Sequence, residues 1–456
     1  MNAVFEDGLS LFAVRRMMEG VVPPSLATAS ADHVPNVGYL SLAEYVDPLH
    51  VALSYQFFNR SRENVLATKR ASLTLDDPYT GAGVVLQLEY ERTETEGPVF
   101  ERLRAKLMGV ASHVGMDDVF HLRGADIYRV SEMRRVPGRK ELPATQPRVD
   151  LPTNSRLLSE RMANCEDLAD LLDTLLCGLG ELLRIDYAML WLFDSSQSAL
   201  TLLASRGYDI DGAGAEISIG EGIVGTAVRE GVPIRVGHMM NMATYARAAR
   251  ERADTLGLAP MLKAGIALPG LKEPRSQLAV PLRARGRVLG ALLVESKHDQ
   301  YFGYDDEDAL MMLCGQFAVA MSLMQPAEPE PPVATPAVSA QPPQSGAPLR
   351  LRRFSRDNSI FLDDEYLIRG VAGAILWKLV GEFLRCGRRE FSNRELRLAP
   401  ELRLPDVQDN LEVRLLLLQR RLAEQKGAAI QLEKCGRGRM RLNVSRPIVL
   451  EIEPAA

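Results

Sequence analysis

The chain has 456 residues, of which 46% are hydrophobic and 25% charged, and its formal net charge is −5. This composition is ordinary for a folded globular protein of about two to four domains, and the net charge alone does not indicate a nucleic-acid partner. The start lacks a basic segment, and no stretch reaches the roughly 18 apolar residues of a membrane helix. We therefore expect a cytoplasmic protein without a membrane span.

Charge is unevenly distributed along the sequence. Residues 349–456 contain 21 Lys and Arg against 15 Asp and Glu, a net charge of +6, which leaves −11 for the first 348 residues. A basic C-terminal module on an acidic body suggests a nucleic-acid-binding tail. The five cysteines are scattered without a CxxC pair, so neither a zinc site nor a disulfide framework is expected.

The first part of the chain predicts a short helix followed by a small antiparallel β-structure. Residues 8–20 have helical spacing, and Pro23 and Pro24 break the chain. Short β-like runs with turn residues between them follow at 25–29, 36–42, 50–54, 71–75, 84–90 and 123–130, and a helix is expected from 96 to about 114.

Residues 20–137 resemble the FMN-binding split barrel of the pyridoxamine-phosphate-oxidase-like family. The resemblance is carried by the segments Pro24–Ser30, Pro35–Ser41, Val51–Phe58, Asn59–Asn64 and Glu96–Phe100. It implies FMN at a dimer interface, with the phosphate held by Arg60, Ser61, Arg62 and Asn64. Asn36, Tyr39, Ser54 and Gln56 would face the isoalloxazine ring.

A structural interpretation of the same residues remains open. Arg60 and Arg62 could be solvated loop charges, and Ser61 could be an ordinary helix N-cap. We find no substrate-specific catalytic residue; Tyr55, His113 and His121 are the nearest candidates, and the catalytic residues stay unknown.

A glycine-rich stretch, Ser218–Val236, lies near the middle of the chain. Gly220, Gly222 and Gly225 match a GxGxxG pattern, which could indicate a dinucleotide site. The preceding strand is short and half polar, however, and the following helix is stopped by Gly231 and Pro233. The context favours a structural turn over pyrophosphate binding.

The segment 151–325 resembles a GAF domain. One helix is expected from Leu158 to Leu183, then strands at 187–193 and 199–206, the glycine turn, a hairpin at 277–295 and a last helix from Tyr304 to about Met324. The resemblance implies a small-molecule ligand between the sheet and the variable segment 237–276. His238 in that segment could ligate a metal but more often such a residue only makes hydrogen bonds, so no metal is predicted.

Residues 138–150 and the proline-rich segment 326–348 are predicted linkers, and 349–456 forms a C-terminal module. Helices are expected at 370–384, after Ser392, and at 409–425, followed by a basic hairpin at 429–444. Leu411, Leu415, Leu418 and Leu422 are the predicted inner stripe of the third helix, with Arg414, Gln419, Arg420 and Arg421 on its surface.

This plan resembles the winged-helix output domains of bacterial response regulators. The resemblance implies DNA contacts by Gln408, Asn410, Arg414, Arg420, Arg421, Lys434, Arg437 and Arg439. Asp406, Asp409 and Glu412 at the helix start depart from that pattern and would repel phosphate. A protein-binding module with arginines on a solvated face is the alternative.

The sequence thus predicts a multi-domain chain: a β-barrel, an α/β GAF domain and a small α+β winged helix. We expect a homodimeric sensor with possible FMN, a GAF ligand and DNA-binding output in transcription regulation. A flavin-dependent oxidoreductase with a regulatory GAF domain is the main alternative, and an adaptor without flavin or DNA is the third. Whether it is an enzyme stays open.

Overall fold

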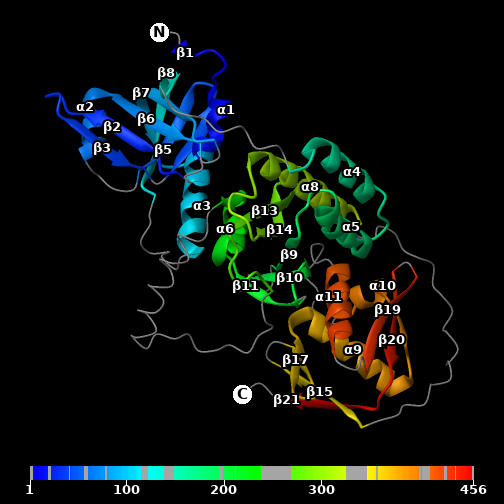
Figure 1. Cartoon of the computed structure of the whole chain (residues 1–456). Helices are drawn as coiled ribbons and strands as arrows, with labels where there is room; N and C mark the ends of the chain where they lie inside the picture. Colours follow the sequence, from blue (N-terminus) through cyan, green and yellow to red (C-terminus); the bar gives the residue numbers. More distant parts are fainter. Residues whose placement is uncertain are drawn as a thin grey trace.

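The chain forms three units, shown in Figure 1 from blue at the N-terminus to red at the C-terminus. The structure is a computed structural model and describes residues 4–18, 22–40, 42–55, 60–77, 80–113, 122–137, 148–194, 199–210, 212–237, 269–324, 347–355, 358–399, 402, 411–425, 429–436 and 438–453. Outside these residues lie Gln56, His121, His238, Gln408, Asn410, Arg437 and residues 326–346 of the predicted linker 326–348.

The N-terminal unit is built on an eight-stranded sheet of order β3-β2-β6-β7-β8-β5-β4, with β1 paired to β8. Its elements are β1 (Val4–Phe5), α1 (Leu11–Val14), the 3₁₀ helix η1 (Arg15–Met18), β2 (Ser25–Ala29), β3 (Pro35–Tyr39), β4 (Ala43–Asp47), β5 (His50–Tyr55), α2 (Arg60–Thr68), β6 (Arg70–Asp76), β7 (Gly83–Glu94), α3 (Pro98–His113) and β8 (Gly124–Arg135). The predicted strands are confirmed, but β4 was missed, because the run 36–42 ends at Tyr39 and a new strand begins at Ala43.

The central unit has a six-stranded sheet of order β11-β10-β9-β14-β13-β12. Its elements are α4 (Leu151–Ala163), α5 (Leu168–Glu181), β9 (Tyr187–Asp194), β10 (Ala199–Arg206), β11 (Glu216–Ser218), α6 (Gly222–Glu230), β12 (Ile234–Val236), β13 (Ser276–Ala284), β14 (Arg287–Ser296) and α8 (Tyr304–Leu323). In β13, Leu278 and Val280 join the core under α4, α5 and α8, whereas Ala279 joins the core under α6. The sheet is therefore covered by helices on both faces.

The prediction of one helix from Leu158 to Leu183 was wrong. Two helices occupy this stretch, and the break comes at Asn164–Asp167. The Asp167 side chain accepts a hydrogen bond from the Asp170 amide and so caps a new helix. An N-cap of this kind satisfies a backbone donor that a continuous helix would bond internally.

The glycine-rich turn is structural. The helix α6 is stopped at Gly231, whose φ of 67° is left-handed, as the sequence predicted. A Cβ atom on Gly225 would lie 2.6 Å from the Ser218 carbonyl oxygen and 2.8 Å from the Gly220 amide nitrogen. Because backbone atoms cannot move aside as a flexible side chain can, only glycine fits where α6 crosses this turn.

The C-terminal unit comprises β15 (Leu349–Phe354), β16 (Ser359–Leu362), β17 (Glu365–Ile368), α9 (Gly370–Cys386), β18 (Glu390–Ser392), α10 (Asn393–Arg397), α11 (Leu411–Glu424), β19 (Ile430–Gly436), β20 (Arg439–Val444) and β21 (Ile448–Glu453). Two sheets, β17-β16-β15-β21 and β18-β20-β19, flank the helices. The predicted leucine stripe of α11 is confirmed, since all four leucines are buried. Ser392 accepts from the Glu395 amide as the predicted N-cap.

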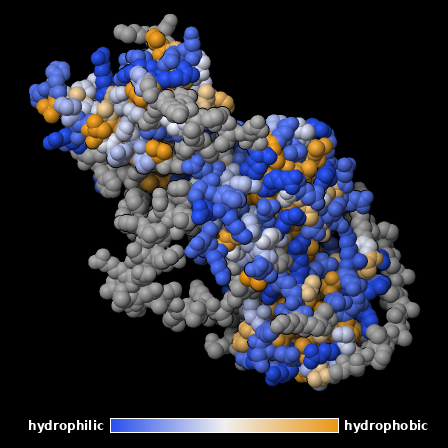
Figure 2. Space-filling model, in the orientation of Figure 1, coloured by the Kyte–Doolittle hydropathy of each residue, from blue (hydrophilic) through white to orange (hydrophobic). Residues whose placement is uncertain are grey.

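The central unit contacts both the N-terminal and the C-terminal unit. Helix α3 packs on α6 and β12, and α11 packs on α5 and β10. The visible face in Figure 2 is mostly hydrophilic, with hydrophobic residues in small groups. In the part of the chain that the structure describes, no helix has the length and apolar character needed to cross a membrane.

Replacing Gly225 by alanine tests the close approach at the glycine turn. We expect Gly225→Ala to destabilise the chain by about 1–3 kcal/mol, because its methyl group meets backbone on two sides. Thermal unfolding measures the effect. Gly315→Ala in α8 is the control: nothing lies within 4 Å of its Cβ, so the better helix former should stabilise by up to about 1 kcal/mol. A loss of stability no larger for Gly225→Ala than for this control contradicts the steric explanation.

Candidate functional site

Three of the residues predicted to hold flavin lie together at the start of α2. The Asn36 amide on β3 donates to the Ser61 hydroxyl over 2.8 Å, and Gly38 on the same strand leaves room for that hydroxyl. Asn64 is buried and donates to the Thr28 hydroxyl over 3.1 Å, so its side chain joins α2 to β2. Asn64 therefore has a structural contact, whereas Ser61 and Asn36 stay at the surface of this site.

The two predicted phosphate arginines have different surroundings. Arg62 forms an ion pair with buried Asp126 on β8, donates to Thr93, and stacks on the Tyr55 ring with its guanidinium carbon 3.5 Å from the centroid. Arg60 is exposed and forms no ion pair with any described residue. Of the two, Arg60 is the guanidinium with room for an outside anion.

Two further predicted flavin residues, Tyr39 and Ser54, lie on β3 and β5, and Tyr55, a catalytic candidate, ends β5. Tyr39 on edge strand β3 is 82% exposed. The Ser54 hydroxyl on β5 accepts a hydrogen bond from the Leu42 amide over 3.2 Å. Tyr55 lies against Arg62, so its ring has a packing role.

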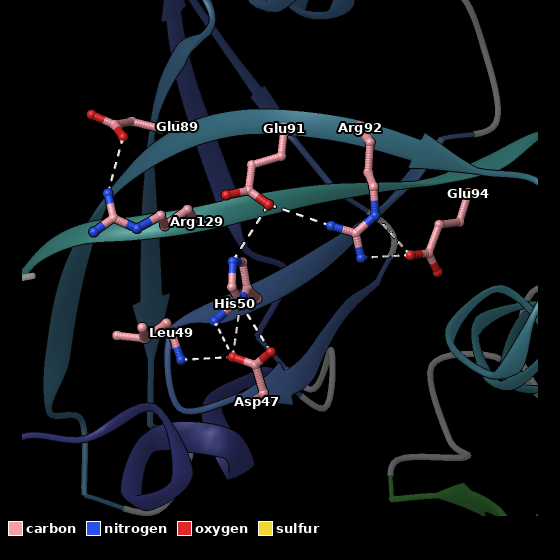
Figure 3. Close-up of polar contacts among 8 residues, drawn as sticks. All are labelled: Asp47, Leu49, His50, Glu89, Glu91, Arg92, Glu94 and Arg129. Carbon is pink, nitrogen blue, oxygen red and sulfur yellow. Dashed lines mark hydrogen bonds and ion pairs between the residues drawn. The ribbon is translucent and has the colours of Figure 1, made fainter. Parts of the chain in front are cut away.

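A second polar cluster surrounds His50 at the β4–β5 turn (Figure 3). His50 Nδ1 lies 2.8 Å and 2.9 Å from the two carboxylate oxygens of Asp47, and its Nε2 lies 3.4 Å from a carboxylate oxygen of Glu91 on β7. Arg92 joins Glu91 to Glu94 on the same strand, and Arg129 on β8 contacts Glu89. Carboxylates only accept hydrogen bonds, so both ring nitrogens donate here only when the imidazole is protonated.

Asp47 is held in its ionised form by this turn. Partial burial opposes ionisation, but donation from the Leu49 amide and from the His50 ring and amide outweighs it, so the pKa of Asp47 lies below its ordinary value. Through His50, the cluster links the β4–β5 turn to β7 by polar contacts. Across the described residues, no group of His, Cys, Asp and Glu is arranged to hold a metal ion.

The central unit buries a carboxylate on the sheet. Glu295 on β14 accepts hydrogen bonds from the Tyr208 hydroxyl at 2.8 Å, the Gln277 amide at 2.5 Å and the Leu271 backbone amide at 3.0 Å. Burial and the neighbouring Glu295 carboxylate raise the pKa of Tyr208, so this hydroxyl stays protonated and donates. Leu271 comes just after the part of the variable segment that is not described, so Glu295 anchors the end of that segment to the sheet.

Trp191 on β9 lies on the α6 side of the sheet. Its side chain is buried with Met189, Leu200 and Leu202, yet its indole N–H has no hydrogen-bond partner among the described residues. A buried N–H without a partner costs free energy unless a further group accepts from it. On this face of the sheet, Trp191 is a buried donor whose partner the described residues do not supply.

An ionic junction joins the N-terminal and central units. Glu44 on β4 contacts Lys106 on α3 at 2.6 Å, and the cations of Lys106, Arg15 and Arg235 all lie within 6 Å of the Tyr304 ring centroid at the start of α8. Burial alone would lower the pKa of Lys106, but Glu44 and other nearby groups raise it, so the ammonium stays charged. Arg104 also reaches Glu230 of α6 at 2.6 Å.

Two of the three predicted DNA-binding arginines on α11 are not at the surface. Arg414 and Arg421 are 8% and 7% exposed, so the prediction of a surface position was wrong for both. The Arg421 guanidinium donates to the Leu367 carbonyl and pairs with Glu424. The leucine pattern did not predict this burial, because α11 also packs on β17 of its own unit, where the Leu367 carbonyl accepts from Arg421.

Two further predicted DNA contacts pair with the central unit. Arg420 on α11 contacts Asp173 of α5 at 2.7 Å, and Lys434 on β19 contacts the α5 N-cap Asp167 at 2.6 Å. Partial burial opposes ionisation of Asp167, but Lys434 and the helix amides lower its pKa below the ordinary value. A third ion pair, Arg369 with Glu216 of β11, joins the same two units. Arg439 stays partly exposed on β20.

Sequence reasoning missed Asp126, Glu295 and Asp173 as partners of site residues. Each is an acidic residue within a strand or helix whose partner lies at least 18 positions away in sequence. A carboxylate in a run of apolar residues, as at Glu295 after Leu292–Val294, was the one available signal.

The comparison with protein families identifies the central unit. The GAF domain model matches residues 165–322, which confirms the GAF domain expected from the sequence. A search of curated proteins found no match.

Solved structures with similarity to the chain each match one part of it. The GAF domain of an Acinetobacter phosphoenolpyruvate-protein phosphotransferase is 23% identical, covers 37% of this chain and 90% of its own, and has a TM-score of 0.30. A free methionine-R-sulfoxide reductase from Neisseria meningitidis is 20% identical, covering 39% and 92% with a TM-score of 0.29. An FMN-binding protein from Syntrophomonas wolfei is 15% identical, covering 28% and 88% with a TM-score of 0.25.

Acid titration of an Asp47→Asn variant tests the His50 cluster. The folded pKa of Asp47 is lowered, so its stabilisation is present above its unfolded pKa of about 3.9 and is lost as pH falls through the folded value. We expect the variant to have a lower Tm than the wild type at neutral pH, and the difference to shrink between about pH 5 and pH 2. A difference in Tm that stays constant over this range contradicts the electrostatic role.

Proposed function

We propose, starting from the GAF domain at residues 165–322, that the chain is a sensor whose GAF domain controls a DNA-binding winged-helix unit at 349–456. A GAF domain indicates a sensory or regulatory role in general. The order α9, β18, α10, α11 and the β19–β20 hairpin supports a winged helix, with α10 and α11 as its helix–turn–helix pair.

The docking of α11 on the GAF domain is the observation that carries this proposal. Leu416 and Leu417 precede Arg420 by one turn and share its face, and both are under 10% exposed. In a winged helix, the recognition helix enters the major groove of DNA. In this proposal that helix is α11, and the side of it that carries Arg420 lies against α5 instead. With α11 docked, this face of the proposed recognition helix is covered, and three cations of its unit are paired with carboxylates.

The GAF sheet connects the ligand face to this contact. Strand β10 pairs with β9, which carries Trp191, and β10 also contacts α11. A ligand that binds one arrangement of this sheet better than the other shifts the equilibrium between docked and released α11 by that difference in affinity. We propose that the ligand is a small polar molecule that accepts from Trp191, with DNA binding as the output.

Neutralising the two acidic partners on α5 tests the docking. We expect the full-length double variant Asp167→Asn and Asp173→Asn to bind duplex DNA about tenfold more tightly than the wild type, because each ion pair holds α11 with up to about 1 kcal/mol. Asparagine keeps the N-cap at 167, so α5 should remain folded. Fluorescence anisotropy with labelled duplex measures the affinity.

A matched control removes two other carboxylates. Glu160 and Glu181 pair with Arg156 and Arg161 inside the central unit, so Glu160→Gln with Glu181→Gln makes the same charge change without removing an ion pair to α11. Equal gains in DNA affinity for both double variants contradict a specific docking effect and indicate only a change in net charge.

We also propose that the N-terminal unit, as a split barrel, binds FMN with its phosphate at the start of α2. The exposed Arg60, the Ser61 hydroxyl and Asn36 fit a phosphate, whereas Arg62 is already bound to Asp126. Bound flavin would supply redox chemistry, and the flavin-dependent oxidoreductase remains the second candidate function on this basis. Turnover of NAD(P)H by the FMN-loaded chain would support the enzyme over the sensor.

Variants of the two arginines separate binding from folding. We expect Arg60→Gln to weaken FMN binding by roughly tenfold or more with little change in Tm, because it removes one charge-assisted contact. Arg62→Gln should instead lower Tm, since it leaves the buried Asp126 carboxylate without its cation. Flavin absorbance and fluorescence quenching measure binding; a wild-type chain that takes up no added FMN rules out both flavin proposals.

A further inference from the structure

The cations of the C-terminal unit fall into two groups. Arg369, Arg420 and Lys434 contact carboxylates of the GAF domain. Arg394, Arg397 and Arg439 form no ion pair with any residue that the structure describes, and Arg394 and Arg397 are fully on the surface. The second group is therefore open to solvent while α11 is docked.

One member of each group, Lys434 and Arg439, lies on the β19–β20 hairpin, and the two are on opposite faces of it. Lys434 is paired with Met440, so it shares the inner face of that buried residue. Arg439 is the neighbour of Met440 along the strand and points to the outer face, as do the exposed side chains at alternate positions of β20. Docking of Lys434 on Asp167 thus leaves Arg439 uncovered.

Helix α10 adds to the outer face. Strand β18 pairs with β20 so that Ser392 is opposite Arg439, and the Asn393 amide donates to the Gly438 carbonyl over 2.8 Å. Arg394 follows directly, and Arg397 lies one helical turn further along, about 5–6 Å away between Cβ atoms. The backbone thus brings α10 next to the start of β20, and we define Arg394, Arg397 and Arg439 together as the arginine patch.

We propose that this arginine patch binds the phosphate backbone of duplex DNA without reading sequence, while α11 remains docked on the GAF domain. The inference rests on the proposed function. It adds a second DNA-binding surface that does not include α11. Guanidinium groups that have no ion pair within the described residues can donate hydrogen bonds to DNA phosphates. Each such contact releases counterions from the DNA and so makes the affinity depend on salt. The nearest carboxylates are engaged: Glu395 with Arg388 and Glu390 with Arg441.

The patch implies two modes of binding in one unit. In the docked state, the patch supplies weak, salt-dependent affinity for any duplex. Release of α11 adds contacts from the first cation group, Arg369, Arg420 and Lys434, and from α11 itself. The ligand of the GAF domain therefore changes the mode of DNA binding rather than switching all affinity on or off.

The test uses the full-length chain and a fluorescein-labelled mixed-sequence duplex of about 30 base pairs, with anisotropy titrations over a series of salt concentrations. We expect the triple variant Arg394→Gln, Arg397→Gln and Arg439→Gln to bind at least tenfold more weakly than the wild type at about 0.1 M salt. The slope of log affinity against log salt should fall by about 3, near one unit per lost phosphate contact. Arg287→Gln, which removes an exposed arginine of the GAF hairpin, should match the wild type.

Tm is measured for every variant, and all four substituted arginines are at or near the surface, so folding should be retained. If the wild type binds duplex DNA and the triple variant keeps the same affinity and salt slope, the proposal that the arginine patch binds DNA is wrong. The proposal that the chain has DNA binding as its output then still holds. If neither the wild type nor the Asp167→Asn, Asp173→Asn variant binds duplex at low salt, DNA output fails and the patch fails with it.

Discussion

Helix α11 is buried on two sides, and the arrangement of the C-terminal half depends on this constraint. One leucine stripe packs inside its own unit, and Leu416 and Leu417 lie on the side of the GAF domain. The buried residues of α5 and α11 belong to one continuous core cluster. Because burying apolar side chains is the main stabilising term, the two units cannot separate without exposing part of that core.

Ion pairs fix the orientation of the C-terminal unit on the GAF domain, and the apolar contact holds the two units together. The three ion pairs described above for this contact place the cation on the C-terminal unit and the carboxylate on the GAF domain. The N-terminal junction is arranged differently: there, cations of both units gather around Tyr304, with Glu44, Glu307 and the acidic start of α8 among them. Such pairs add little stability when exposed, but they fix orientation and exclude unpaired alternatives.

Local patterns predicted most elements well. Alternation located most strands of the N-terminal unit, the glycine turn and the stop at Gly231 followed from backbone chemistry, and the α11 stripe followed from helical spacing. The break between α4 and α5 was missed, because the N-cap Asp167 only weakly disturbs the helical spacing of the leucines around it. The burial of Arg414 and the Arg62–Asp126 pair could not be predicted, because each depends on residues brought close only by tertiary packing.

The contact between α5 and α11 also has a consequence for synthesis of the chain. Asp173 and Arg420 are 247 positions apart, and Asp167 and Lys434 are 267 apart. Domains fold in order as they leave the ribosome, so the GAF domain is complete while its partner helix has not yet been made. For that interval α5 presents an apolar surface to water with Asp167 and Asp173 not yet paired, and such charges beside an apolar surface oppose its association with other chains.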